Sequence, residues 1–208
     1  MKLGHITGWE LEQVVFPSGT GSEYDFLTIT HFKNWKAIDE VRSYWTDEMW
    51  TTLTNGLTPE QLELADNAQE YRETVKREIW TATDMVFAPG GKRPMYAVEN
   101  FMRIPPGGMG VWKDMETEFV MPVHKKSIEM GTRAGWLMGF MVMPRGKDYN
   151  YQASTIDFYD SWEQMGLDEG KAWQAVHPDV NWGEAIQLFN AASTIVQTEV
   201  RRLIDYVD

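Results

Sequence analysis

The stretch GWLMGFMVMPRGKDYNYQASTIDFYDSW, residues 135–162, decides the predicted fold because it occurs twice in the chain. Residues 8–35, GWELEQVVFPSGTGSEYDFLTITHFKNW, match it without a gap at a constant offset of 127. The identical pairs include Gly8/Gly135, Trp9/Trp136, Pro17/Pro144, Gly19/Gly146, Tyr24/Tyr151, Thr28/Thr155, Ile29/Ile156 and Trp35/Trp162. Average residue usage gives roughly two identities by chance over such a window, so the sequence indicates an internal duplication.

Each copy of this stretch predicts a β-hairpin followed by a helix. In the first copy, apolar and polar residues alternate, with Leu11 and Val15 on one face of a strand and Glu10 and Glu12 on the other. A turn rich in Pro and Gly follows, and then a second strand of β-branched and aromatic residues. The many acidic residues on helix faces are expected to be solvated surface.

The last segment of each copy predicts a long helix. Residues 58–61 (TPEQ) combine a Thr N-cap, a Pro at the first helical position and a Gln for a capping box. We expect this helix to extend to about Trp80. Residues 181–184 (NWGE) predict a second capping box before a helix over residues 182–206.

The second copy contains a strand and a helix that the first copy lacks. Residues 96–104 predict the strand, and residues 112–130 predict a helix that Pro122 kinks and Gly131 ends. At the same offset, residues 1–4 correspond to the tail of that helix. We therefore expect an α+β protein of two ferredoxin-like (split βαβ) repeats. The domains are residues 1–88, a first repeat without its first strand and most of its first helix, and residues 95–208, a second repeat.

The predicted sheets require burial on both faces. Trp136, Met138, Phe140 and Val142 recur on one face of a strand, which we expect to lie opposite the helices. Packing the two repeats sheet to sheet, as an intrachain α/β barrel, would bury this face. The incomplete first repeat leaves an unpaired strand edge. We expect either self-association as a homo-oligomer or about 40 to 50 further residues upstream in the natural protein.

Composition narrows the classes of partner. The chain has 208 residues, a net charge of −12 and a pI of about 4.8. A nucleic-acid-binding protein needs a basic surface, and anionic membranes repel an acidic one, so neither partner is expected. No apolar run approaches the length of a membrane-spanning helix. We expect a soluble bacterial protein, exported if a signal peptide lies upstream; the absence of cysteine does not fix the compartment.

The hairpin residues together with Glu118, Pro122, His124 and Gly131 resemble the dimeric α/β-barrel superfamily. The chain is most similar to its tandem-repeat, uncharacterised bacterial members and to stress-responsive and antibiotic-biosynthesis-monooxygenase-like barrels. The superfamily includes cofactor-free monooxygenases of polyketide quinones, haem-degrading monooxygenases and chlorite dismutase. The resemblance covers essentially the whole chain, but its motifs are turns, core aromatics and one histidine, which specify fold better than activity.

The catalytic candidates are His124, Asn100 and Tyr159. His124 follows Val123 on the apolar stripe of its helix, where it would act as a general base or haem ligand; the alternative is a histidine on the helix surface. The resemblance to haem-degrading barrels implies a catalytic role for Asn100, with Tyr159 and His177 as the nearest equivalents of an aromatic residue and a histidine. This chain departs from that pattern at two positions. Tyr159 stands where a Trp is expected, and His177 precedes a Pro instead of lying inside a helix.

The candidate ligand-binding residues are Trp136, Tyr151, Tyr24 and His31, which lie on the hairpin strands. Inward-pointing aromatic residues suit a flat apolar ligand, although core filling is the alternative. The histidine spacing predicts no metal site. We therefore expect a small apolar or aromatic ligand between sheet and helices, and no cofactor. The alternative is a cofactor-independent or haem-dependent monooxygenase, and the sequence does not decide whether the protein is an enzyme.

Overall fold

The computed structural model describes residues 6–20, 22–43, 50–51, 54–90, 92–146 and 148–208. The chain forms two compact units that interleave in sequence. The first unit comprises residues 1–11, 26–77 and 204–208, and the second comprises residues 12–25 and 78–203. Residues 1–4, predicted as the tail of a helix, lie outside the described residues. The strands hydrogen-bond in the order β2-β1-β7-β4-β6-β5-β3.

The second unit contains a βαββαβ arrangement. Its strands are β4 (Tyr96–Arg103), β5 (Gly135–Met143), β6 (Ala153–Tyr159) and β7 (Thr194–Val207), the end of which belongs to the first unit. Its helical elements are α4 (Met109–Asp114), the π-helical η2 (Met115–Val120), α5 (Met121–Glu129), α6 (Trp162–Met165), α7 (Gly170–Val176) and α8 (Trp182–Ala192). The order β7-β4-β6-β5 is that of a ferredoxin-like sheet, which confirms this part of the predicted fold class.

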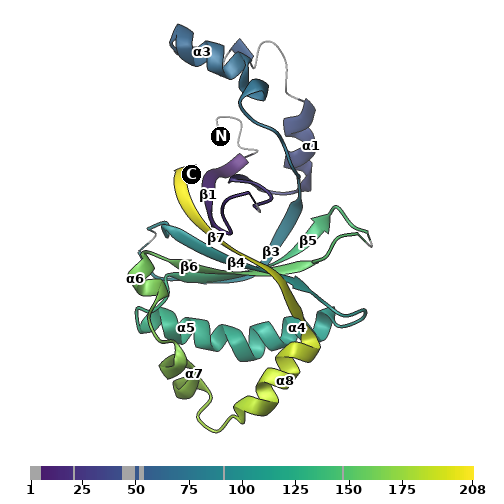
Figure 1. The fold of residues 1–208 in the computed structure, drawn as a ribbon, viewed down its shortest axis with the longest axis vertical. Helices are drawn as coiled ribbons and strands as arrows, with labels where there is room; N and C mark the ends of the chain where they lie inside the picture. Colours follow the sequence, from purple (N-terminus) through teal and green to yellow (C-terminus); the bar gives the residue numbers. More distant parts are fainter. Residues whose placement is uncertain (1–5, 21, 44–49, 52–53, 91, 147) are drawn as a thin grey trace. The chain divides into compact units, whose positions relative to one another are not determined.

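The predicted helix over residues 112–130 is present in the structure, with a π-helical turn in its middle. Elements α4, η2 and α5 follow one another without a break, and Figure 1 shows them along one face of β4, β5 and β6. Gly131 has a φ of 75°, the left-handed conformation that ends a helix at low cost only for glycine. Pro122 lies just after the π-helical turn, inside this continuous run of helix, where it has no N–H to donate to the preceding turn.

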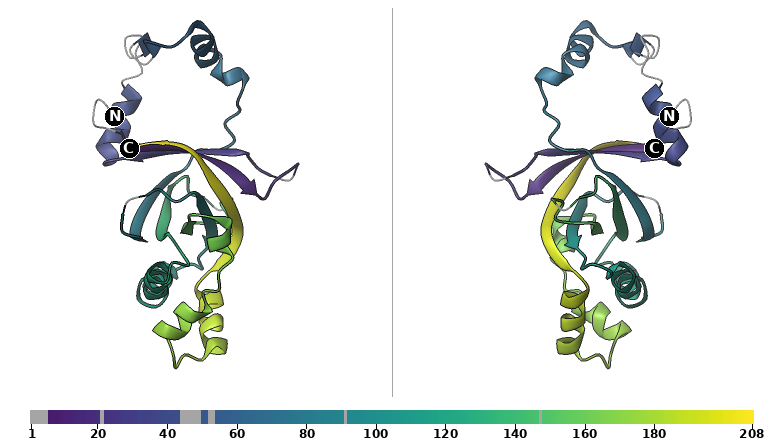
Figure 2. Two further views of the ribbon diagram at one scale, coloured as in Figure 1. Left: turned by 90° about the vertical axis from the view of Figure 1, so that its left-hand side faces the viewer. Right: turned by 90° about the vertical axis from the view of Figure 1, so that its right-hand side faces the viewer.

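Both predicted terminal helices are too long. The capping box at Thr58 is present, but the helix it begins, α3 (Pro59–Asp66), ends at Asp66. The 3-10 turn η1 (Ala68–Glu70) follows, and residues 79–87 form a strand. Likewise α8 ends at Ala192 and leads directly into β7, as both views in Figure 2 show. The missed strands are rich in β-branched residues, and each pairs with a partner distant in sequence. Tertiary pairing therefore overrides the helical apolar spacing.

The strand added at the end of the sheet is β3 (Ile79–Phe87), which pairs antiparallel with β5. Gly135 allows close approach here, because a Cβ at this position would lie 2.3 Å from the Phe87 ring. That ring instead packs against Phe158 at a centroid distance of 5.1 Å. A side chain at Gly135 would force the Phe87 ring to move from this position.

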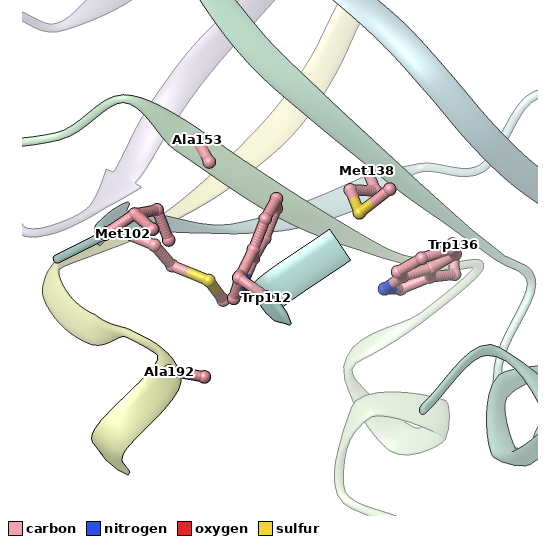
Figure 3. Packing of buried hydrophobic residues seen from close by; sticks show 7 residues of the cluster. Met102, Trp112, Trp136, Met138, Ala153 and Ala192 are labelled. Atoms are coloured by element: carbon pink, nitrogen blue, oxygen red, sulfur yellow. The ribbon is translucent and has the colours of Figure 1, made fainter. Parts of the chain in front are cut away.

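The main core of the second unit lies between the sheet and the helices. Trp112, Trp136 and Met138 are at most 1% exposed, and Figure 3 shows the Trp112 side chain facing the sheet. Phe140 packs edge-to-face on Trp112, with ring centroids 5.4 Å apart. The prediction that Trp136, Met138 and Phe140 face away from the helices is therefore wrong. Side chains one residue out of phase, such as Met141, occupy the opposite face.

The described residues of the first unit include a hairpin and the helices α1 and α3. Strand β1 (Ile6–Phe16), whose last residues belong to the second unit, is followed by β2 (Phe26–Phe32), α1 (Trp35–Ser43) and α3. Strand β2 lies at one end of the strand order. In the part of the chain that is described, no helix has the length and apolarity needed to cross a bilayer.

Candidate functional site

A buried arginine with three carboxylates lies on the sheet face opposite the helices of the second unit. Arg201 of β7 is 1% exposed; its Nε lies 2.7 Å from Glu12 Oε2, and its Nη1 contacts Glu99. Glu199 Oε2 lies 3.8 Å from the same Nη1. Because Glu99 and Glu199 are direct cross-strand partners, their like charges would repel without this guanidinium.

Two further polar groups hold Glu199 in place. The Tyr24 hydroxyl lies 2.7 and 2.8 Å from the two carboxylate oxygens of Glu199, and Gln197 Nε2 donates to one of them over 2.7 Å. Burial and then this carboxylate raise the pKa of Tyr24 well above its ordinary value. Burial lowers the pKa of Arg201, but Glu99 and Glu12 more than offset this and raise it overall. The phenol and the guanidinium therefore keep their protons.

An aromatic cluster occupies the same sheet face. Phe101 follows Glu99 by two residues on β4, so both side chains point to one side. The Phe101 and Tyr151 rings lie 4.7 Å apart, and Trp80 stacks on Tyr151 at 6.1 Å and 20°. Glu78 accepts hydrogen bonds from the Tyr151 hydroxyl, at 2.7 Å, and from the Trp80 indole, at 2.9 Å.

Tyr151 also lines a cavity of about 420 Å³ at the turn end of the β5–β6 hairpin. The lining residues are Met109, Phe140, Met141, Pro144, Arg145, Gly146, Tyr149, Tyr151 and Gln152. The cavity is mostly apolar and aromatic, with Arg145 as its one charged residue among the described lining; Arg145 Nε donates to the Val142 carbonyl at 2.9 Å. This volume and composition are those of a site for a small organic molecule.

His124 lies on the other face of the sheet, within the helix-packed core. Its ring is 8% exposed and stacks on Trp136 at 5.0 Å and 23°, so the alternative of a surface histidine is wrong. Nδ1 has no hydrogen-bond partner among the described residues. Burial, followed by the charge of Arg133, lowers the pKa of His124 to about 2. The imidazole is neutral at physiological pH and is a weak base.

A second buried ion cluster surrounds Arg133 near this histidine. Its Nε lies 3.0 Å from Glu169, its Nη1 contacts Asp157, and its guanidinium carbon lies 5.6 Å from the centre of the Tyr159 ring. Burial raises the pKa of Asp157 to about 6 although Arg133 opposes this shift. Burial also raises the pKa of Tyr159. Tyr159 is thus held by an arginine rather than exposed to a ligand.

Glu116 is a buried carboxyl group on the π-helical turn of the same layer. It is 5% exposed, and burial, followed by the neighbouring Asp157 carboxylate, raises its pKa to about 8. The folded protein therefore binds a proton that the unfolded chain releases near the ordinary glutamate pKa of 4.5. Stability from this group is fully present below pH 4.5 and is lost as pH rises to about 8.

We expect Glu116→Gln to flatten this pH dependence. Between about pH 6 and pH 8 the free energy of unfolding of the wild type should fall, while that of the variant should change less. At pH 8 the variant should be more stable by on the order of 1–3 kcal/mol. Urea unfolding at several pH values measures this, with Glu118→Gln, an exposed carboxyl group on the same turn, as the control. Parallel curves for Glu116→Gln and wild type would contradict the buried, protonated state.

The remaining predicted residues, Asn100, His177 and His31, each have a different hydrogen-bond partner. Asn100 Oδ1 accepts from Thr198 Oγ1 at 2.9 Å, and His177 Nε2 contacts the Phe119 carbonyl at 2.9 Å. In the first unit, His31 is 45% exposed and lies 2.7 Å from a Glu10 carboxylate oxygen. The structure does not bring Asn100, His177 and Tyr159 into one site.

The residues predicted as candidates for haem chemistry, His124, Tyr159 and His177, do not fit a haem group. His124 and Tyr159 lie among packed side chains, and neither lines the hairpin cavity. His177 directs one ring nitrogen to a backbone carbonyl. Among the described residues, no three His, Asp or Glu side chains converge as metal ligands.

Sequence reasoning missed the Arg201 cluster because residues 193–206 were predicted to be helical. Glu12 was predicted on the strand face opposite Leu11 and Val15. It is 5% exposed there and lies beside buried Val14. One sequence pattern could have revealed the cluster: a charged residue that interrupts a strand of mainly apolar residues. Glu99 in AVENF and Glu199 in TEVRR both interrupt such a strand.

No protein-family model and no curated protein matches the chain. Among solved structures, it is similar to an anthrone oxidase-like protein, with 12% identity, a TM-score of 0.53, and coverage of 98% of this chain and 78% of that one. It is also similar to a proposed monooxygenase from Fusobacterium nucleatum subsp. nucleatum, with 5% identity, a TM-score of 0.50, and coverage of 97% and 77%. At such identities the likeness shows a shared ferredoxin-like, α/β-barrel type of fold.

Proposed function

We propose that the chain binds a small planar aromatic molecule in the cavity at the β5–β6 hairpin. The observation that carries this proposal is that Tyr151 both lines the cavity and belongs to the aromatic cluster on the sheet face opposite the helices. A ring inserted there would meet Tyr149 and Tyr151, with methionine side chains around it. Stacked or edge-to-face aromatic contacts favour a flat ligand.

The cavity also contains polar groups that suit a phenol or quinone. Arg145 offers a cation and Gln152 an amide on its lining. The Gln152 carbonyl oxygen already accepts from the Ile104 backbone N–H at 3.0 Å, which fixes this side chain. This location replaces the expected one between sheet and helices, because Trp112, Trp136 and Met138 fill that layer.

We expect Tyr151→Ala to weaken binding of 1,8-dihydroxyanthraquinone by about 10-fold or more, because a buried aromatic contact and its packing are lost. Tyr151→Phe should retain most of the affinity. Equilibrium titration followed by ligand absorbance measures both. Tyr71→Ala, at an exposed tyrosine of the first unit, is the control and should bind like the wild type. Equal affinity of Tyr151→Ala and wild type would refute this site.

A second candidate function is cofactor-independent oxidation of such a ligand. It is favoured by the similarity to an anthrone oxidase-like protein and to a proposed monooxygenase. In the corresponding reaction, anthrone and O₂ give anthraquinone and water. Oxygen uptake with anthrone as substrate distinguishes this function from binding alone, since a binding protein would not raise the uncatalysed rate.

We also propose that the chain is an internal duplication arranged as an intrachain barrel. Support comes from element bounds at the offset of 127. The residues of β2 fall on those of β6, and β1 and β5 end at corresponding residues, Phe16 and Met143. Helices begin at the equivalent Trp35 and Trp162. The strands that close the copies, β3 and β7, also occupy comparable places, each beside the first hairpin strand of the other copy.

A further inference from the structure

A second cavity, of about 720 Å³, lies between α7 and α8. Its aromatic lining comes from Trp173 and His177 at α7 and from Trp182 and Phe189 on α8. It shares no lining residue with the cavity at the β5–β6 hairpin, as far as the described residues go. The proposed function does not use it, and an aromatic cavity of this size is large enough for a small organic molecule.

The aromatic rings of this cavity pack edge to face and form a corner. The Trp173 and Trp182 rings meet at 89° with centroids 5.1 Å apart, and Phe189 lies 6.2 Å from Trp173 at 67°. Phe119 supports the corner from behind, with its ring 6.0 Å from Trp173 and stacked on His177 at 4.0 Å. Trp182 lines the cavity and is 38% exposed, and the π-face of a tryptophan attracts quaternary ammonium groups.

The charges around this corner favour a cation. Asp179 lies in the connection between the helices, flanked by the lining residues Pro178 and Val180, and Glu184 is in the first turn of α8. None of the described lining residues is Lys or Arg. The whole chain carries a net charge of −12, which attracts cations and repels anions. Trp182 is 38% exposed, so a ligand can reach its ring from solvent.

We propose that the α7–α8 cavity binds a small organic cation of the quaternary ammonium class. The rings supply cation–π attraction, and the Asp179 and Glu184 carboxylates supply a longer-range field. This site is independent of the hairpin cavity. The failure of either proposal leaves the other standing.

The test compares choline with 3,3-dimethylbutan-1-ol, which has the same shape but no charge. Isothermal titration calorimetry of the full chain should show choline binding, with the neutral alcohol weaker by about 3- to 30-fold, the range of a cation–π contact. Trp182→Ala should lose a similar factor for choline, and Trp182→Phe should lose less. Trp162→Ala removes a comparably exposed tryptophan of the same unit and should leave choline affinity unchanged.

A second variant tests the same site without removing a large side chain, so that a loss of binding cannot be attributed to misfolding. Asp179→Asn keeps the exposed loop side chain nearly isosteric and should weaken choline without affecting the alcohol. Equal binding of choline and the alcohol would show an ordinary apolar groove and overturn the proposal. No detectable choline binding, or binding that Trp182→Ala and Asp179→Asn both leave unchanged, would overturn it as well.

Discussion

Replacing Arg201 with methionine is expected to destabilise the protein by about 3–5 kcal/mol, because it leaves buried carboxylates without a counter-charge. Glu12, Glu99 and Glu199 are each at most 7% exposed, so water cannot replace the guanidinium. Methionine retains much of the side-chain volume, which separates the loss of charge from the creation of a cavity. Urea unfolding near neutral pH measures the difference.

The control for this prediction is Arg202→Met on the same strand. Arg202 is exposed and donates to Gln13 Oε1 at 2.9 Å. A surface contact of this kind contributes at most about 1 kcal/mol. If Arg201→Met cost no more than Arg202→Met, the three carboxylates would not depend on this guanidinium.

Trp112→Ala should cost about 3–5 kcal/mol, the range for removing a fully buried large aromatic residue. The side chain is 0% exposed, contacts Phe140 and lies at the centre of the helix–sheet core. Thermal and urea unfolding should both detect this loss. Val111→Ala is the matched control, because Val111 is adjacent on α4 and 65% exposed, and its replacement should change stability by less than about 0.5 kcal/mol. Similar effects of the two substitutions would contradict the placement of Trp112 in the core.

The hairpins could be predicted from the sequence because local chemistry specifies them. Alternation, a turn with Pro and Gly, and β-branched residues all favour the same structure, and β1, β2, β5 and β6 are present as expected. The strands β3 and β7 could not be predicted in this way. Their pairing partners β5 and β1 lie far away in sequence, whereas the nearby capping boxes favoured helices.

Part of the candidate site was within reach of the sequence. Tyr151 and Tyr24 were predicted on strands, which is wrong: each lies two residues before its strand, β6 or β2. The structure places Tyr151 beside a cavity and Tyr24 on the Arg201 cluster. His124 was predicted on the apolar stripe of its helix, but the pattern could not show that its ring would stack on Trp136. Arg201 could not be found from the sequence because its role depends on Glu12, which lies 189 residues away.

The two faces of the sheet in the second unit serve different purposes. The helix face is a packed core in which Trp112 and His124 are buried. The opposite face carries the Arg201 cluster and the aromatic cluster, whose Tyr151 also lines the hairpin cavity. A ligand that entered the helix face would have to displace core side chains, whereas the hairpin cavity already has room for it.

A crystal structure of the protein grown with 1,8-dihydroxyanthraquinone tests the central proposal most directly. We expect planar density at the turn end of the β5–β6 hairpin, in contact with Tyr149 and Tyr151 and with Arg145 near a ligand oxygen. Density for the ligand between Trp112 and the sheet, or an empty hairpin cavity at saturating ligand, would contradict the proposal.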